Sequence, residues 1–117
     1  MAAFSPDSKT LAVGLVGVGK EEKVVKLYDV ASGNSTASIP AKGGIPYILN
    51  CLTFSPDGKT LAVGTSWESN LWDVATGKSL ATLAEKGMLG AVFSSDGKTL
   101  AVGNPDGKIM LWEITRN

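Results

Sequence analysis

The sequence predicts an all-β protein that is built from one antiparallel sheet repeated along the chain. Two phrases recur within its 117 residues. The first phrase reads FSPDSKTLAVG at 4–14, FSPDGKTLAVG at 54–64 and FSSDGKTLAVG at 93–103. The second phrase reads LYDVASG at 27–33, LWDVATG at 71–77 and LWEITRN at 111–117. Repeats of this period are typical of chains whose unit buries its surface only against neighbouring units.

The first two strands of the middle unit are expected at Leu49–Ser55 and Thr60–Thr65. Pro56 fixes φ for the second position of a turn and Gly58 tolerates a positive φ, so these strands should form a hairpin. Thr60–Thr65 (TLAVGT) is apolar or small at almost every position. A strand with one wet face would alternate with charges, so we expect this strand to be covered on both faces.

Two further short strands, Asn70–Val74 and Ser79–Leu83, are expected to complete the unit, joined by a turn at Ala75–Lys78. Leu71 and Trp72 should face opposite ways, because successive side chains of a strand alternate. The unit is therefore predicted to be a four-stranded antiparallel meander with two buried faces, as in a propeller blade. A two-layer sandwich is the structural alternative, but it would leave the outer face of each TLAVG strand in water.

The whole chain is predicted to hold eleven strands in three such units. We expect a partial β-propeller with three antiparallel meander blades at about 1–41, 47–84 and 88–117, the last lacking its outer strand. Closed propellers typically have four to eight blades, so three would form an open arc with two apolar end faces. The arc would be completed by a homo-oligomer, two copies making six blades, or by the remainder of a larger propeller. A truncated fragment with no independent function is the alternative.

The order FSPDGKTLAVG followed by LWDVATGK resembles the WD-repeat β-propeller family, in the style common in bacterial members. Trp72-Asp73 is the dipeptide that names the family, and Tyr28-Asp29 and Trp112-Glu113 are its variants. Family repeats often carry a Gly-His pair and a Ser or Thr that hydrogen-bond in series to the Trp. This chain has no histidine, and Val13, Val63 and Val102 stand where Ser is usual. Because the polar links are lost together, we expect apolar packing with no orphaned polar group.

The resemblance implies a non-catalytic protein–protein interaction scaffold. In the family, the connections between blades and between the second and third strands gather at one end and form a recognition surface. The corresponding segments are Leu15–Lys26, Pro40–Asn50, Thr65–Ser69, Ala84–Gly90 and Asn104–Lys108. The candidate contact residues within them are Trp67, Glu68, Tyr47, Lys20, Glu21 and Met88. An exposed Trp is a typical interface anchor, although Trp67 can equally fold back over the neighbouring blade.

The chain offers few residues for catalysis, and we expect neither enzyme activity nor a cofactor. Gly14–Lys20 fits the phosphate-binding pattern G-x-x-x-x-G-K, which makes a nucleotide hydrolase the competing hypothesis. However, Glu21 stands at the magnesium-ligating Ser/Thr position, and a repeated strand follows in place of a helix. Asp7, Asp57 and Asp96 occupy the same turn of the three units, where Asp commonly bonds nearby backbone, so we expect no metal site.

Composition and charge argue against several classes of partner. Lys and Arg total 11, as do Asp and Glu, so the net charge is zero and nothing favours nucleic acid or an anionic membrane. No apolar run approaches the roughly 20 residues of a spanning helix. The single cysteine, Cys51, is expected in the core, and a lone cysteine favours a reducing compartment. With no signal-peptide pattern at Met1, we expect a cytoplasmic protein with protein partners.

Overall fold

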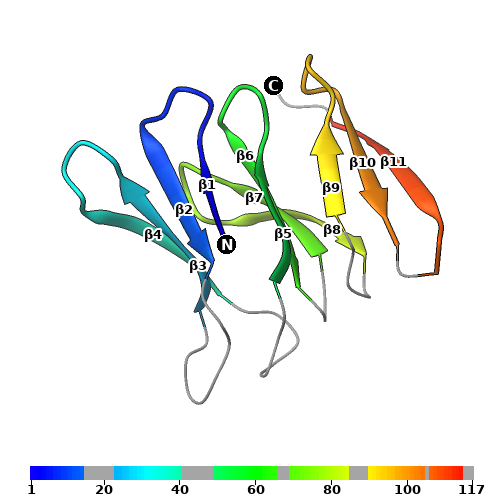
Figure 1. The fold of residues 1–117 in the computed structure, drawn as a ribbon, viewed down its shortest axis with the longest axis horizontal. Coiled ribbons are helices and arrows are strands. Elements are labelled where there is room, and N and C mark those ends of the chain that lie inside the picture. The colour runs from blue at the N-terminus through cyan, green and yellow to red at the C-terminus, as the bar shows by residue number, and fades with distance from the viewer. Residues whose placement is uncertain (15–22, 41–48, 66–68, 85–89, 105, 115–117) are drawn as a thin grey trace.

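The computed structural model describes residues 1–14, 23–40, 49–65, 69–84, 90–104 and 106–114, and every regular element in them is a β-strand (Figure 1). The strands are β1 (Ala2–Phe4), β2 (Thr10–Gly14), β3 (Lys23–Asp29), β4 (Ser35–Pro40), β5 (Leu49–Phe54), β6 (Thr60–Thr65), β7 (Ser69–Asp73), β8 (Ser79–Ala84), β9 (Gly90–Phe93), β10 (Thr99–Gly103) and β11 (Ile109–Glu113). Sheet 1 has the order β1-β2-β3-β4, sheet 2 the order β5-β6-β7-β8 and sheet 3 the order β9-β10-β11. All described pairings are antiparallel, which confirms the predicted all-β fold with a three-stranded last sheet.

The first two strands of every sheet are joined by the same hydrogen-bonded turn. In sheet 1 the Ser5 hydroxyl donates to Asp7 Oδ1 at 2.6 Å and accepts the Thr10 amide at 3.0 Å. Asp7 Oδ1 also accepts the backbone amide two residues later, at 2.9 Å. The same bonds recur within Ser55–Thr60 and Ser94–Thr99. The three aspartates are therefore held in structural roles, as expected from the sequence.

The turns also need a residue with a positive φ. Gly58 and Gly97 have φ values of 72° and 74°, and Ser8 occupies the same position of the first turn at 61°. This left-handed region is open to glycine and unfavourable to side chains with a Cβ, most of all to β-branched ones. The prediction of a positive φ at Gly58 is therefore confirmed.

Substitutions at this turn position should change stability in opposite directions. Gly58→Val and Gly97→Val should each lower the free energy of unfolding by about 1 kcal/mol or more, because a β-branched residue is strained there. Ser8→Gly should raise it slightly by removing the strain already present. Urea titration of the three variants checks this expectation, and unchanged unfolding midpoints in all three would contradict it.

The register of the strands gives each sheet two faces with different side chains. The face called the front face carries Phe4, Leu11 and Tyr28 in sheet 1, Phe54, Leu61 and Trp72 in sheet 2, and Phe93, Leu100 and Trp112 in sheet 3. The face called the back face carries Ala3, Ala12 and Leu27 in sheet 1, Thr53, Ala62 and Leu71 in sheet 2, and Val92, Ala101 and Leu111 in sheet 3. The front faces thus carry large aromatic and aliphatic groups, and the back faces carry smaller ones.

Sheet 2 lies between the other two sheets (Figure 1). It contributes one face to each of two hydrophobic cores, one shared with sheet 1 and the other with sheet 3. The back face of sheet 1, with Leu27, packs against the front face of sheet 2, with Leu61 and Trp72. The back face of sheet 2, with Leu71, packs against the front face of sheet 3, with Leu100. Every residue of β6 is buried, so the expectation of two covered faces is confirmed for the middle unit. In β2 and β10 the fully buried residues are those that face sheet 2.

Two expectations from the sequence were wrong in detail. The segment Leu15–Lys26 was assigned to a connection, but β3 begins at Lys23, and Lys26 pairs with Val13. The strand starts early because its first residue, Lys23, pairs with Pro40 of β4, whereas its pairing with β2 begins only at Val25. Contrary to the expectation that no polar group is orphaned, Trp112 Nε1 is buried without a hydrogen-bond partner among the described residues. Such a group costs roughly 1–3 kcal/mol.

Candidate interaction surfaces

The six contact residues predicted from the sequence lie outside the described residues. They are Trp67, Glu68, Tyr47, Lys20, Glu21 and Met88. The described strand ends that border their segments share one edge of each sheet, since Gly14 pairs with Val25 in sheet 1 and Leu49 with Thr65 in sheet 2. In Figure 1 the ends of β2, β4 and β6 point to the lower edge, opposite the repeated turns. The involvement of the six residues in binding stays a prediction.

The last of the predicted segments, Asn104–Lys108, forms a tight turn in its described part. The Asn104 amide donates to the Lys108 carbonyl oxygen at 2.8 Å, and Gly107 has a φ of 85°. The Lys108 amide lies 3.4 Å from Asp106 Oδ1. This segment is thus a short hairpin connection, with little chain available to form a recognition loop.

Gly14, the first residue of the phosphate-binding pattern, is engaged within the protein. Its amide donates to the Met1 carbonyl oxygen at 2.7 Å, and Leu49 packs so closely that a Cβ at Gly14 would collide with it. Among the described residues, the next element is strand β3 and not the helix whose N-terminus would hold a phosphate. Lys20 and Glu21 of this pattern lie outside the described residues. Nothing described here favours nucleotide binding.

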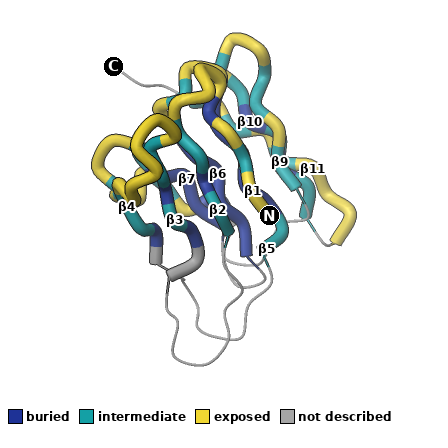
Figure 2. Tube along the Cα trace, turned by 60° about the vertical axis from the view of Figure 1, so that its left-hand side comes forward, coloured by how far each residue is buried: buried dark blue, intermediate teal, exposed yellow. Residues whose placement is uncertain are grey.

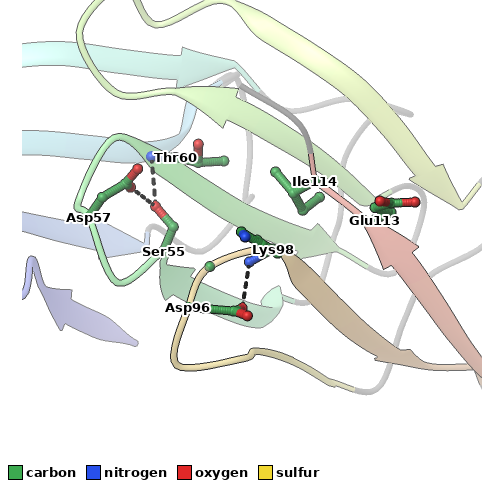
Figure 3. Close-up of a pocket in the computed structure, with 8 residues that line it drawn as sticks. Ser55, Asp57, Thr60, Asp96, Lys98, Glu113 and Ile114 are labelled. Atoms are coloured by element: carbon green, nitrogen blue, oxygen red, sulfur yellow. Dashed lines mark hydrogen bonds between the residues drawn. The ribbon is translucent and has the colours of Figure 1, made fainter. Parts of the chain in front are cut away.

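A polar hollow of about 440 Å³ lies between the repeated turns of sheets 2 and 3 (Figure 3). It is lined by Ser55, Asp57, Thr60, Asp96, Gly97, Lys98, Glu113 and Ile114. Its two aspartates serve the turns: Asp57 Oδ1 accepts the Ser55 hydroxyl at 2.6 Å, and Asp96 Oδ1 accepts the Ser94 hydroxyl at 2.6 Å and the Lys98 amide at 2.9 Å. The hydrogen bond from Ser94, followed by that from the Lys98 amide, lowers the pKa of Asp96. These groups stabilise the local backbone.

The described residues offer few groups that could act as a nucleophile or bind a metal ion. Within it, no group of three or more Cys, Asp or Glu side chains is arranged to hold a metal ion. Cys51 is buried, as predicted, and burial raises the pKa of its thiol to about 11. A neutral buried thiol is a poor nucleophile. Over the same residues, no helix is long and apolar enough to cross a bilayer.

The back face of sheet 3 is apolar and uncovered. Val92 is 65% exposed, Ile109 76% and Leu111 72%. The same repeat position as Leu111 is occupied by Leu27, which is 1% exposed, and by Leu71, which is 4% exposed. A position that is buried in two sheets and exposed in the third marks a surface that lacks its neighbour.

The front face of sheet 1 is the second uncovered surface. Phe4 is 60% exposed, whereas Phe54 at the same repeat position is 8% exposed. Leu11 is only half-buried, whereas its counterparts Leu61 and Leu100 are fully buried. Figure 2 shows the contrast, with β6 and β7 of the middle sheet in dark blue and much of β1 in yellow. The two ends of the arc therefore expose opposite faces of the repeated sheet.

A hollow on the back face of sheet 3 matches a filled position in sheet 1. It is lined by Gly90, Ala91, Val92, Ala101, Val102, Gly103 and Ile109 and has a volume of about 330 Å³. Gly103 corresponds to Gly14, which Leu49 of sheet 2 covers. A Cβ at Gly103 would meet no described atom within 4 Å. The hollow is thus the position where a side chain from a further sheet would lie.

Two stretches of the chain, residues 33–73 and 77–113, match the sequence model of a family described as "WD domain, G-beta repeat". Together they cover more than half of the chain. The first stretch spans β4 to β7 and the second spans β8 to β11. Each match therefore contains the last strand of one sheet and the first three strands of the next. A search of curated protein sequences found no significant match.

Proposed function

Because the chain belongs to the WD40 repeat family, we propose that it is a non-catalytic scaffold that binds other polypeptide chains. Repeats of this family typically serve as protein-interaction scaffolds and are generally non-catalytic. The observation that carries the proposal is the pair of uncovered apolar sheet faces, which include Phe4 at one end and Leu111 at the other. Contiguous exposed apolar surface of this kind marks interaction sites in soluble proteins.

The finer proposal is that recognition uses the segments that differ between the repeats. Residues outside the repeated phrases are free of the packing rules that fix the sheets. The proposal is supported by the described strand ends that flank these segments, which lie at one edge of sheets 1 and 2. Trp67 is the largest apolar group among the proposed contacts. The other proposed contacts belong to the same class of segments and are Glu68, Tyr47, Lys20, Glu21 and Met88. The lone, buried Cys51 supports a cytoplasmic location as part of the same proposal.

Trp67→Ala is expected to weaken partner binding by roughly 2 kcal/mol, a factor of about 30 in affinity, because interface tryptophans are frequent hot spots. The free energy of unfolding of the chain should change much less. The assay captures proteins from an extract of the source cells on immobilised wild-type and Trp67→Ala chains, with quantitative mass spectrometry of the bound proteins. Urea denaturation of both chains measures the effect on the fold.

The Trp67→Ala variant also tests the alternative that Trp67 folds back over the neighbouring blade. If this variant loses as much stability as a core truncation, Trp67 packs inside the fold and is not an anchor. If it captures the same proteins in the same amounts as the wild type, the proposed recognition surface is wrong. A matched control is Val30→Ala, which truncates an exposed residue in a tight turn at the opposite edge and should leave capture unchanged.

A further inference from the structure

Building on the proposed scaffold function, we infer that a second copy of this chain packs head-to-tail against the first. The front face of sheet 1 in one copy lies on the back face of sheet 3 in the other. The occupant of the two uncovered faces is thus the same polypeptide. Each face provides the surface that the other lacks.

The chain already makes this interface twice within itself. In both internal interfaces a back face of small and aliphatic groups meets a front face of aromatic and aliphatic groups. Sheet 1 keeps its front face free and sheet 3 keeps its back face free, so one copy has both halves of a third such interface. Packing these two faces would reproduce a geometry for which the repeated sequence is already suited.

The correspondence extends to individual positions. Where Leu61 and Trp72 pack against sheet 1, the second copy would present Leu11 and Tyr28 against sheet 3. Leu111, 72% exposed, would then become buried like Leu27 and Leu71 at the same position. Phe4, 60% exposed, would become buried like Phe54. The groups left exposed in the single copy are the groups that the other sheets bury.

Charge is compatible with this packing. Lys26 lies on the front face of sheet 1, and the acidic Glu113 lies on the back face of sheet 3. Lys26 and Glu113 carry opposite charges, so these two side chains do not repel each other in the contact. The chain has zero formal net charge, so two copies do not repel each other at long range. Pairing of identical faces would instead bring like charges together, Lys26 with Lys26 or Glu113 with Glu113, which disfavours that arrangement relative to the head-to-tail contact.

Head-to-tail contacts close into a ring when their rotation brings the last copy back to the first. Two copies related by a twofold axis would place six sheets in the ring, within the typical four to eight. Both contacts in such a dimer are identical, so neither apolar face remains in water. A heterologous contact that failed to close would instead give open filaments.

A pair of single-cysteine variants tests the contact directly. Ala3, the counterpart of Val92, packs against the core that contains Leu52, the counterpart of Ala2. Val92→Cys in one copy and Ala2→Cys in the other should therefore form a disulfide when the two chains are mixed and oxidised. Each variant alone should remain uncross-linked, because identical faces do not meet. The native Cys51 is buried in the core and should not compete.

A charge introduced on the uncovered back face of sheet 3 provides the second test of the contact. Leu111→Lys, introduced into the Val92→Cys chain, should abolish the mixed cross-link, since it would bury an unpaired charge in the contact. The control Val30→Lys, at a residue 45% exposed in a tight turn, should leave the cross-link intact. Circular dichroism confirms that each variant remains folded.

The outcomes separate the head-to-tail dimer from the scaffold function. Absence of a mixed cross-link at micromolar concentration, or equal cross-linking in a single-variant sample, would overturn the head-to-tail contact. If proteins are still captured through Trp67 in that case, the scaffold function stands. A chain that gives the mixed cross-link and captures no protein supports the contact and overturns the proposed recognition function.

Discussion

Trp72→Ala is expected to lower the free energy of unfolding by about 3–5 kcal/mol, the usual cost of truncating a buried aromatic side chain. Trp72 is 4% exposed and belongs to the core between sheets 1 and 2. Its removal would leave a cavity next to Leu61, its cross-strand neighbour. Chemical denaturation at a fixed protein concentration measures the change, because self-association would add a concentration-dependent term.

Leu80→Ala is the control for this substitution. Leu80 lies in β8 of the same sheet but is 47% exposed, so its truncation should change stability much less than that of Trp72. Equal losses for the two variants would mean that the interface between sheets 1 and 2 does not carry the stability of the fold. A small loss for Trp72→Ala alone would contradict its assignment to the core.

Leu61→Ala should cost about 2–5 kcal/mol, the range for a buried leucine in a well-packed core. Leu61 is fully buried and is the second residue of β6, the strand whose residues are all buried. Val30→Ala, at a residue that is 45% exposed, should cost far less. Thermal and urea unfolding of both variants measure the difference, and a loss below that of Val30→Ala would show that β6 is not the centre of the fold.

The repeated phrases predicted most of the local structure. The chemistry of a turn is set by a few residues, so Pro56 and Gly58 predicted both the hairpin and the positive φ. Uniform apolar composition predicted that β6 is covered on both faces. The alternation of Leu71 and Trp72 is also confirmed, since they contribute to different cores.

Features that depend on contacts between sheets were harder to predict. Val102 stands where the family usually has Ser, but this substitution does not reveal that the Trp112 indole N–H is left without a partner among the described residues. The start of β3 at Lys23 depends on its pairing with Pro40 of β4, which a local pattern does not specify. The candidate contacts, Trp67 among them, lie in segments without a repeated pattern, and the sequence gives no packing rule for such segments.

The mass of the protein in solution tests most directly whether a second copy covers the two end faces. Multi-angle light scattering on the purified chain at micromolar concentration should give twice the 12.1 kDa of one chain. The Leu111→Lys variant should shift toward the mass of a single chain, while Val30→Lys keeps the doubled mass. A monodisperse wild-type species of 12.1 kDa would contradict the account, because its two apolar faces would then remain in water without a second copy.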